Sequence, residues 1–110
     1  MTSTHSNIFS DQAHDEIDAS IVILRSYSPE AAQKWYAQLR ATLKSLEWSP
    51  ERFPLAPEDA RYRTGVRQVV FGKRKSVTRI LYRVDGSLVR ILRVRFGPRD
   101  LISPDELNGD

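Results

Sequence analysis

Residues 77–99 read VTRILYRVDGSLVRILRVRFGPR, and this stretch decides the fold that the sequence predicts. Two β-rich runs flank Asp85-Gly86, a dipeptide that favours a type I′ hairpin turn because both central residues of that turn need positive φ. A two-residue loop at this position predicts four cross-strand pairs: Val84 with Ser87, Tyr82 with Val89, Ile80 with Ile91, and Thr78 with Arg93.

The two faces of this hairpin differ in character, because side chains alternate across a strand. One face is apolar and carries Ile80, Tyr82, Val84, Val89 and Ile91. The other face carries Arg79, Arg83 and Arg90, beside Leu81, Leu92 and Val94. We expect the first face to pack against a core and the second to face something negatively charged.

Basic residues concentrate in the second half of the chain. Between Arg61 and Arg99 there are twelve, with Asp85 as the one acidic residue, although the whole chain has a net charge of only +3. Such a polarised chain indicates a surface for nucleic acid or an acidic partner. A solvated sheet that carries many arginines is the alternative, and the run Lys73-Arg74-Lys75 fits either interpretation.

Composition bounds the class of protein. The chain has 110 residues, of which 40% are hydrophobic, so we expect one domain over 1–110 with frayed ends at 1–7 and 101–110. It has no cysteine, which excludes disulfides and thiolate metal sites, and its two histidines lack spaced partners. No apolar run reaches the ~18–20 residues of a membrane span, and there is no signal-peptide core. A cytoplasmic protein without a cofactor is the expectation.

Two helices are predicted before the strands. Ser10 is a plausible N-cap for the first, which runs to about Tyr27. Ser28-Pro29 caps and starts the second, which is expected to end near Trp48. The buried stripe of the second helix is predicted to comprise Ala32, Trp35, Leu39, Leu43 and Leu46.

The remaining segments complete the predicted fold. Ile8-Phe9 is a candidate short strand, the proline-rich segment 49–65 is predicted to be a loop, and 66–71 to be a strand. Helices followed by consecutive strands indicate an α+β fold, with an N-terminal helical hairpin packed on one face of a small antiparallel β-sheet.

The chemistry that the sequence offers is that of arginine and lysine on strands. These side chains bind phosphate or stabilise its charge, but arginine stays protonated and does not serve as a general acid or base. The sequence shows no nucleophile–base pair and no glycine-rich phosphate loop.

Six groups of short motifs follow one another along the chain: Ser28-Pro29 with Ala31-Ala32, Arg52-Phe53-Pro54 with Pro57-Glu58, Gly65-Val66-Arg67, Arg79 to Val84, Val89 to Val94, and Gly97 to Asp100. In their order and spacing they resemble the RelE/ParE superfamily of toxins from type II toxin–antitoxin modules. The resemblance covers about residues 8–100. It implies a growth-inhibiting α+β toxin that is neutralised by a cognate antitoxin, for which an exposed edge strand and the grooves beside a helical hairpin are suitable docking places.

The superfamily implies two activities. RelE-like members cleave mRNA on the ribosome, and here Arg79 and Arg99 match the arginines that would stabilise phosphate charge. Where those enzymes carry a tyrosine or histidine near the C-terminus, however, this chain has Ser103, Pro104 and Asp105. ParE-like members instead bind and poison DNA gyrase, and the Gly97–Asp100 ending and long second helix look closer to this branch.

The sequence therefore favours a gyrase-directed toxin. A ribosome-dependent endoribonuclease, an inactive toxin and a non-toxic basic module that binds nucleic acid are the alternatives. The candidate target-binding residues are Arg67, Lys73, Arg74, Lys75, Arg83 and Arg90.

Overall fold

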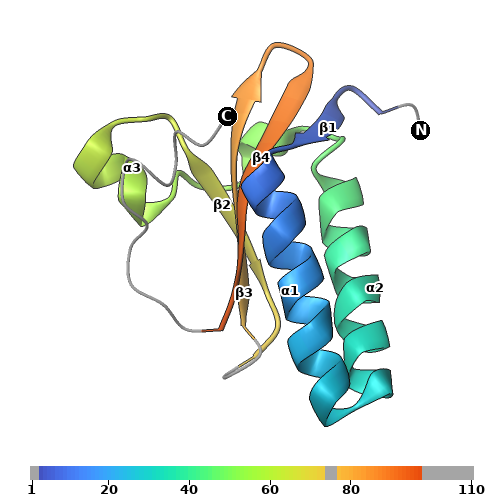
Figure 1. Cartoon of the computed structure of the whole chain (residues 1–110). Coiled ribbons are helices and arrows are strands. Elements are labelled where there is room, and N and C mark those ends of the chain that lie inside the picture. The colour runs from blue at the N-terminus through green and yellow to red at the C-terminus, as the bar shows by residue number, and fades with distance from the viewer. Residues whose placement is uncertain (1–2, 74–76, 98–110) are drawn as a thin grey trace.

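The computed structural model describes residues 3–73 and 77–97 and confirms the predicted α+β architecture, with two helices covering one face of a sheet (Figure 1). In chain order the elements are β1 (Ser6–Phe9), α1 (Asp11–Tyr27), α2 (Pro29–Ser45), the 3₁₀-helix η1 (Pro50–Arg52), α3 (Pro57–Tyr62), β2 (Arg67–Phe71), β3 (Thr78–Asp85) and β4 (Leu88–Phe96).

The described sheet has the strand order β1-β4-β3-β2 and is mixed. Strands β2, β3 and β4 pair antiparallel as predicted, whereas β1 runs parallel to β4, from Ser6 opposite Leu88 to Phe9 opposite Ile91. The prediction of a wholly antiparallel sheet was therefore wrong for β1. A two-residue apolar signal at Ile8-Phe9 says nothing about which strand it will join, and the long connection through the helices permits a parallel pair. Strand β1 also begins inside the stretch 1–7 that was expected to fray.

The β3–β4 hairpin turns at Gly86-Ser87, not at Asp85-Gly86, so the predicted partners were wrong by two residues for Val84 and Tyr82 and by three for Ile80 and Thr78, which lie beyond a bulge. Val84 faces Val89, and Tyr82 faces Ile91. Gly86 has φ +60°, so glycine supplies the positive φ at the first position of the turn instead of the second. A shift of two residues leaves every side chain on its face, and the predicted apolar face indeed packs against the helices.

A bulge in β4 inverts the alternation near its end. Tyr82 pairs with Ile91 but Leu81 pairs with Arg93, which leaves Leu92 as the extra residue between them. Val94 consequently points toward the helices and is 1% exposed. Its predicted position among the arginines on the other face was wrong, because strict alternation does not anticipate a bulge.

Side-chain caps fix where the helices begin. The Ser10 hydroxyl accepts a hydrogen bond from the Ala13 amide at 3.0 Å, and the Ser28 hydroxyl accepts one from the Ala31 amide at 3.2 Å. The second helix, α2, ends at Ser45, three residues before the predicted end. There the Arg52 guanidinium donates to the carbonyls of Ser45 and Trp48, which satisfies acceptors that a helix end leaves open.

The main core lies between the helices and the sheet. It contains the predicted stripe residues Trp35, Leu39, Leu43 and Leu46 together with the apolar hairpin face. The Trp35 indole donates to the Thr78 hydroxyl at 2.8 Å and meets Phe96 edge-on, with ring centroids 6.0 Å apart. Burying this indole with a hydrogen-bond partner avoids the cost of an unsatisfied N–H.

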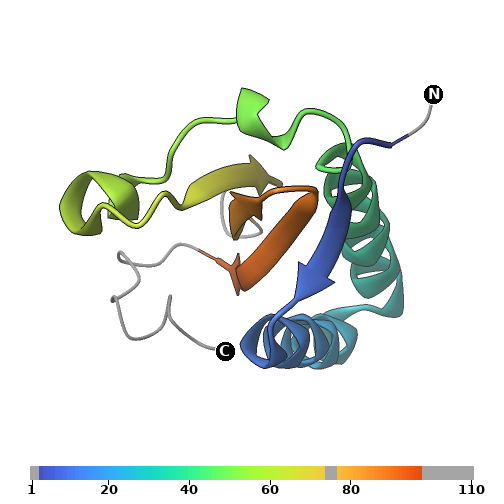
Figure 2. The ribbon, with the colours of Figure 1, turned by 90° about the horizontal axis from the view of Figure 1, so that it is seen from above.

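The segment 49–65 is not the featureless loop that was predicted. It contains η1 and α3, and α3 lies on the side of the sheet opposite the α1–α2 pair (Figure 2). Beneath it is a second apolar cluster formed by Ala56, Val66, Leu81 and Leu92, with Tyr62 packed against it. A six-residue helix is too short to show a hydrophobic period in the sequence.

Candidate functional site

Arg79, the leading catalytic candidate of the sequence analysis, lies in a closed ion pair beneath α3. Its guanidinium donates to both carboxylate oxygens of Glu58, at 2.9 and 2.6 Å, and twice to the amide oxygen of Gln68, at 2.9 and 2.7 Å. The Glu58 side chain is 0% exposed and that of Arg79 is 14% exposed. The guanidinium thus already holds a bidentate anion, and that anion belongs to the chain itself.

The position of Glu58 follows from how α3 is built. Pro57 occupies the first helical turn, where its missing N–H costs nothing, and Glu58 follows it near the positive end of the helix dipole. The Ala56 amide donates to the Val66 carbonyl at 2.9 Å, and the Gly65 amide donates to the Asp59 carboxylate at 2.5 Å. Both ends of α3 are therefore fastened close to the start of β2.

Two of the candidate target-binding arginines also hold this segment. Arg67 donates to the Phe53 carbonyl at 2.7 Å and to the Glu51 carbonyl at 3.1 Å. Arg83 donates through Nε to the Thr64 carbonyl at 2.8 Å. Arg67 lies opposite Tyr82, on the core side, whereas Glu58 and Thr64 contact Arg79 and Arg83, so part of the arginine-rich face is occupied by residues 58–64, which the sequence analysis did not place against it.

The other candidates are more dispersed. Arg90 is exposed and pairs with Asp85, Nε to Oδ2, at 3.1 Å. Lys73 is exposed just after β2, at the end of the sheet away from Arg90, and lines a hollow beside Trp35. Arg74, Lys75 and Arg99 lie outside the described residues.

A third arginine cluster, which the sequence analysis missed, joins α1 to the edge of β4. Glu16 accepts hydrogen bonds from Arg93 at 2.9 and 2.8 Å, and Arg95 Nε lies 3.2 Å from its carboxylate. The same carboxylate accepts from the Val94 amide at 2.9 Å, on the part of β4 beyond the end of β1. The Glu16 carboxylate thereby provides a hydrogen-bond acceptor for an amide on the part of the β4 edge that does not pair with β1. Nothing in the local sequence connects residues 77 positions apart.

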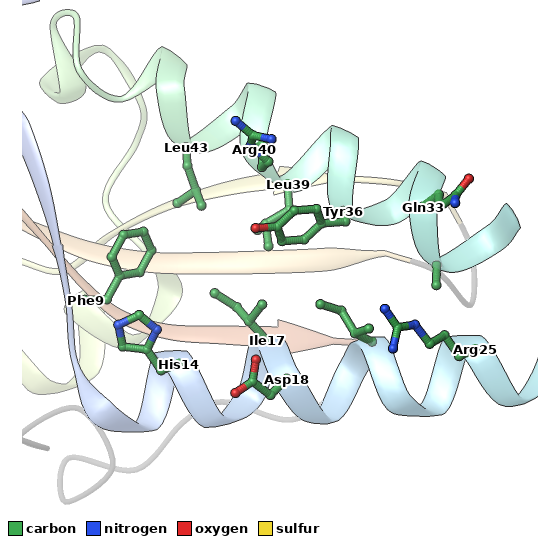
Figure 3. Close-up of a pocket in the computed structure, with 12 residues that line it drawn as sticks. Phe9, His14, Ile17, Asp18, Arg25, Gln33, Tyr36, Leu39, Arg40 and Leu43 are labelled. Carbon is green, nitrogen blue, oxygen red and sulfur yellow. The ribbon is translucent and has the colours of Figure 1, made fainter. Parts of the chain in front are cut away.

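An apolar groove of about 490 Å³ separates α1 from α2 (Figure 3). In Figure 3, His14, Ile17 and Arg25 come from α1 and Tyr36, Leu39 and Leu43 from α2, with Phe9 of β1 at one end of the groove and Arg40 at the rim on α2. The apolar part of the lining comprises Phe9, Ile17, Ile21, Ala32, Leu39 and Leu43, and Gln33 adds a further polar side chain. Tyr36 is 43% exposed, so the groove presents an aromatic ring to solvent. This surface suits the apolar face of a partner helix.

Tyr82 is the tyrosine closest in sequence to the candidate arginines, and it is buried on the core side. Its hydroxyl donates to the Pro50 carbonyl at 2.6 Å, and burial raises the pKa of the phenol to about 12. A phenol held protonated and turned into the core is structural and is not placed to exchange protons with a substrate on the arginine face.

Metal-binding clusters and membrane-spanning helices are both absent from residues 3–73 and 77–97. No cluster of three or more histidine, cysteine, aspartate or glutamate side chains there could coordinate a metal ion. None of the helices in that part of the chain combines the length and apolarity needed to cross a membrane.

Comparison with known proteins places this geometry in context. The family model for the ParE toxin of the type II toxin–antitoxin system parDE matches residues 8–101. Seven chains of known structure match, including one described as the chromosomal ParDE TA system from P. aeruginosa. The alignment with that chain covers 88% of this chain and 100% of that one, with a TM-score of 0.70 at 20% sequence identity. No curated protein sequence matches.

Proposed function

The chain belongs to the ParE toxin family of type II toxin–antitoxin systems, and from this we propose that it inhibits DNA gyrase and is neutralised by a cognate antitoxin. In the cell it would act in the cytoplasm, where gyrase and its DNA are found. The observation that favours gyrase over mRNA as the target is the closed ion pair between Arg79 and Glu58.

The endoribonuclease alternative requires Arg79 to contact a phosphate. In this chain the buried Glu58 carboxylate occupies the Nη1–Nη2 fork of the guanidinium and the Gln68 amide oxygen occupies the Nε–Nη2 fork, so a phosphate approaching the same place would meet a negative charge. The sequence has no histidine or tyrosine after Tyr82, whose hydroxyl faces the core. These features support a toxin that works by binding.

The interhelical groove supports the proposed neutralisation. An amphipathic helix of the antitoxin would place apolar side chains on the floor of the groove, near Ile17 and Leu39. Arg25 and Arg40 at the rims would pair with acidic residues of that helix. A segment that is disordered alone and folds on binding suits such a surface.

The gyrase proposal is tested with purified toxin in a supercoiling reaction on relaxed plasmid DNA. We expect micromolar toxin to block supercoiling and added antitoxin to restore it. Primer extension on a translated mRNA, run with the same toxin, provides the second measurement. Unaffected supercoiling together with codon-phased mRNA cuts would reject gyrase and establish the endoribonuclease alternative.

The antitoxin surface is tested by charge reversal at the groove. Arg40→Glu should weaken antitoxin binding by about tenfold, because an exposed rim charge that attracted the partner now repels it. Lys44→Glu, one turn further along α2 and outside the groove lining, is the matched control. Equal effects of the two substitutions in a titration calorimeter would show that the groove is not the docking place.

A further inference from the structure

One row of side chains crosses the outer face of the sheet, and its positive charges are only partly balanced within the sheet. Arg90 on β4 lies directly opposite Arg83 on β3 and opposite Ile8 on β1. Arg83 in turn donates to the carbonyl of Thr64, the residue that follows Arg63 in the chain, so the C-terminal end of α3 lies at one end of the row. Like charges directly opposite each other in an antiparallel pair are destabilising.

In a second cross-strand arginine pair of the same hairpin, each positive charge is compensated by a carboxylate. Arg79 faces Arg95 across β3 and β4, but each has a carboxylate from another element, Glu58 for the first and Glu16 for the second. For Arg83 and Arg90 the described partners are a backbone carbonyl and Asp85, whose side chain is 65% exposed. An ion pair this exposed contributes little stability, and Asp85 offsets only one of the two arginine charges, so Arg83 and Arg90 leave the row with a net positive charge.

The backbone conformation of Arg63 is an independent indication that the row does something other than stabilise the folded chain. It ends α3 with φ 54° and ψ 50°, in the left-handed conformation that a helix end normally assigns to glycine. Its side chain is exposed. An arginine held at a position where glycine would be less strained points to a function for the side chain.

We propose that Arg63, Arg83 and Arg90, the arginine row, bind the phosphate backbone of duplex DNA. The proposal rests on the proposed function, since the DNA in question would be the duplex that gyrase holds, but DNA binding itself needs no gyrase to be measured. The hydrogen bonds to Thr64 and Asp85 use one N–H each of Arg83 and Arg90, and each guanidinium has five.

Phosphate suits the row better than an acidic peptide does. Guanidinium groups bind phosphate oxygens bidentately, and a flat line of cations across neighbouring strands matches a ligand that is charged along its whole length. A peptide that docks by folding needs several apolar anchors, and in this row Ile8 is the apolar side chain. The interhelical groove, which has such anchors, is on the other side of the sheet (Figure 2).

The size of the effect follows from three phosphate contacts. Each contributes about −0.9 to the slope of log affinity against log salt, so the row predicts a slope of about −2.7. Between roughly 50 and 200 mM salt, affinity for DNA should then fall about 40-fold. Removing one arginine should lower the slope by about one.

The experiment measures fluorescence anisotropy of a labelled 20-base-pair duplex with the full chain and no gyrase. Arg63→Gly and Arg90→Gln remove one charge each, while the first relieves the left-handed strain and the second relieves the like-charge pair. Both variants should therefore melt no lower than the parent protein and still show the reduced slope. Lys44→Gln, which removes an exposed charge from α2, is the matched control and should keep the parent slope.

Three results would overturn the proposal. They are no binding at about 100 μM protein in 50 mM salt, an equal loss in Lys44→Gln and the row variants, and displacement of the duplex by polyglutamate at the same charge concentration. The last result would assign the row to an acidic protein segment. If the duplex does not bind but supercoiling is still blocked, the DNA proposal fails and the gyrase proposal stands.

Discussion

Replacing Glu58 with glutamine should destabilise the fold severely, although the substitution exchanges only one carboxylate oxygen for an NH2 group. Glu58 is fully buried, and its two carboxylate oxygens accept hydrogen bonds from Nη1 and Nη2 of Arg79, which is itself 14% exposed. The amide keeps the volume and one acceptor but removes the charge. The Arg79 cation would then lie beneath α3 with no described carboxylate against its forks.

The expected size comes from that uncompensated charge. Breaking a buried ion pair by removing one partner costs about 3–5 kcal/mol, and the partial exposure of Arg79 and its bonds to Gln68 favour the lower end. We expect a loss of about 3 kcal/mol. For 110 residues, an unfolding entropy of about 2.1 cal/mol/K per residue converts this into a fall in Tm of roughly 13 °C.

The assay is urea denaturation and a thermal melt of Glu58→Gln, of the single variants Glu58→Leu and Arg79→Met, and of the double variant Glu58→Leu with Arg79→Met. Because an apolar pair removes both charges, the double variant should be more stable than Glu58→Gln and should recover at least half of the loss. It should also still block gyrase supercoiling, since the pair only holds α3 on the sheet. A Glu58→Gln protein within about 3 °C of the parent Tm, or a double variant as unstable as the sum of its single changes, would refute this reasoning.

Three further predictions concern the other anchoring contacts. Glu16→Gln should lower the free energy of unfolding by about 2 kcal/mol in urea titrations, because it removes the counter-charge of Arg93, whose side chain is 11% exposed. The Tyr82 phenol has a pKa raised to about 12 in the folded chain, so it holds a proton that the unfolded chain releases near pH 10. Stability should therefore fall between pH 10 and 12, by about 2–3 kcal/mol at most, and Tyr82→Phe should abolish that fall in urea titrations across this range. Ser28→Ala should cost about 1 kcal/mol in a thermal melt, because it removes the cap on the Ala31 amide.

The parts of the fold that the sequence predicted well are those set by local chemistry. Serine caps at Ser10 and Ser28 act within one helical turn, and both helices begin where these residues indicate. Alternation in the hairpin identified the buried face even though the register was wrong, because a two-residue slip does not exchange faces.

The parts that escaped prediction depend on partners far away in the chain. The bulge at Leu92 and the parallel pairing of β1 are properties of neighbouring strands and leave no signal in a single segment. Glu58 and Glu16 are ordinary acidic residues in the sequence, and only the folded chain brings them to Arg79 and Arg93. The sequence thus located the arginines correctly on strands, but it did not reveal which of them form ion pairs with carboxylates of the same chain.

The distinction between arginines that are paired within the fold and the exposed arginine row affects how the antitoxin can neutralise the toxin. The groove between α1 and α2 and the arginine row lie on opposite sides of the sheet (Figure 2). An antitoxin helix confined to the groove would leave Arg83 and Arg90 uncovered, so neutralisation would have to act on contact with gyrase itself. The toxin–antitoxin complex should then retain the salt-dependent affinity of the free toxin for duplex DNA while it loses inhibition of supercoiling. Loss of both activities together would mean that the antitoxin also reaches the outer face, past the edge of β2 or β1.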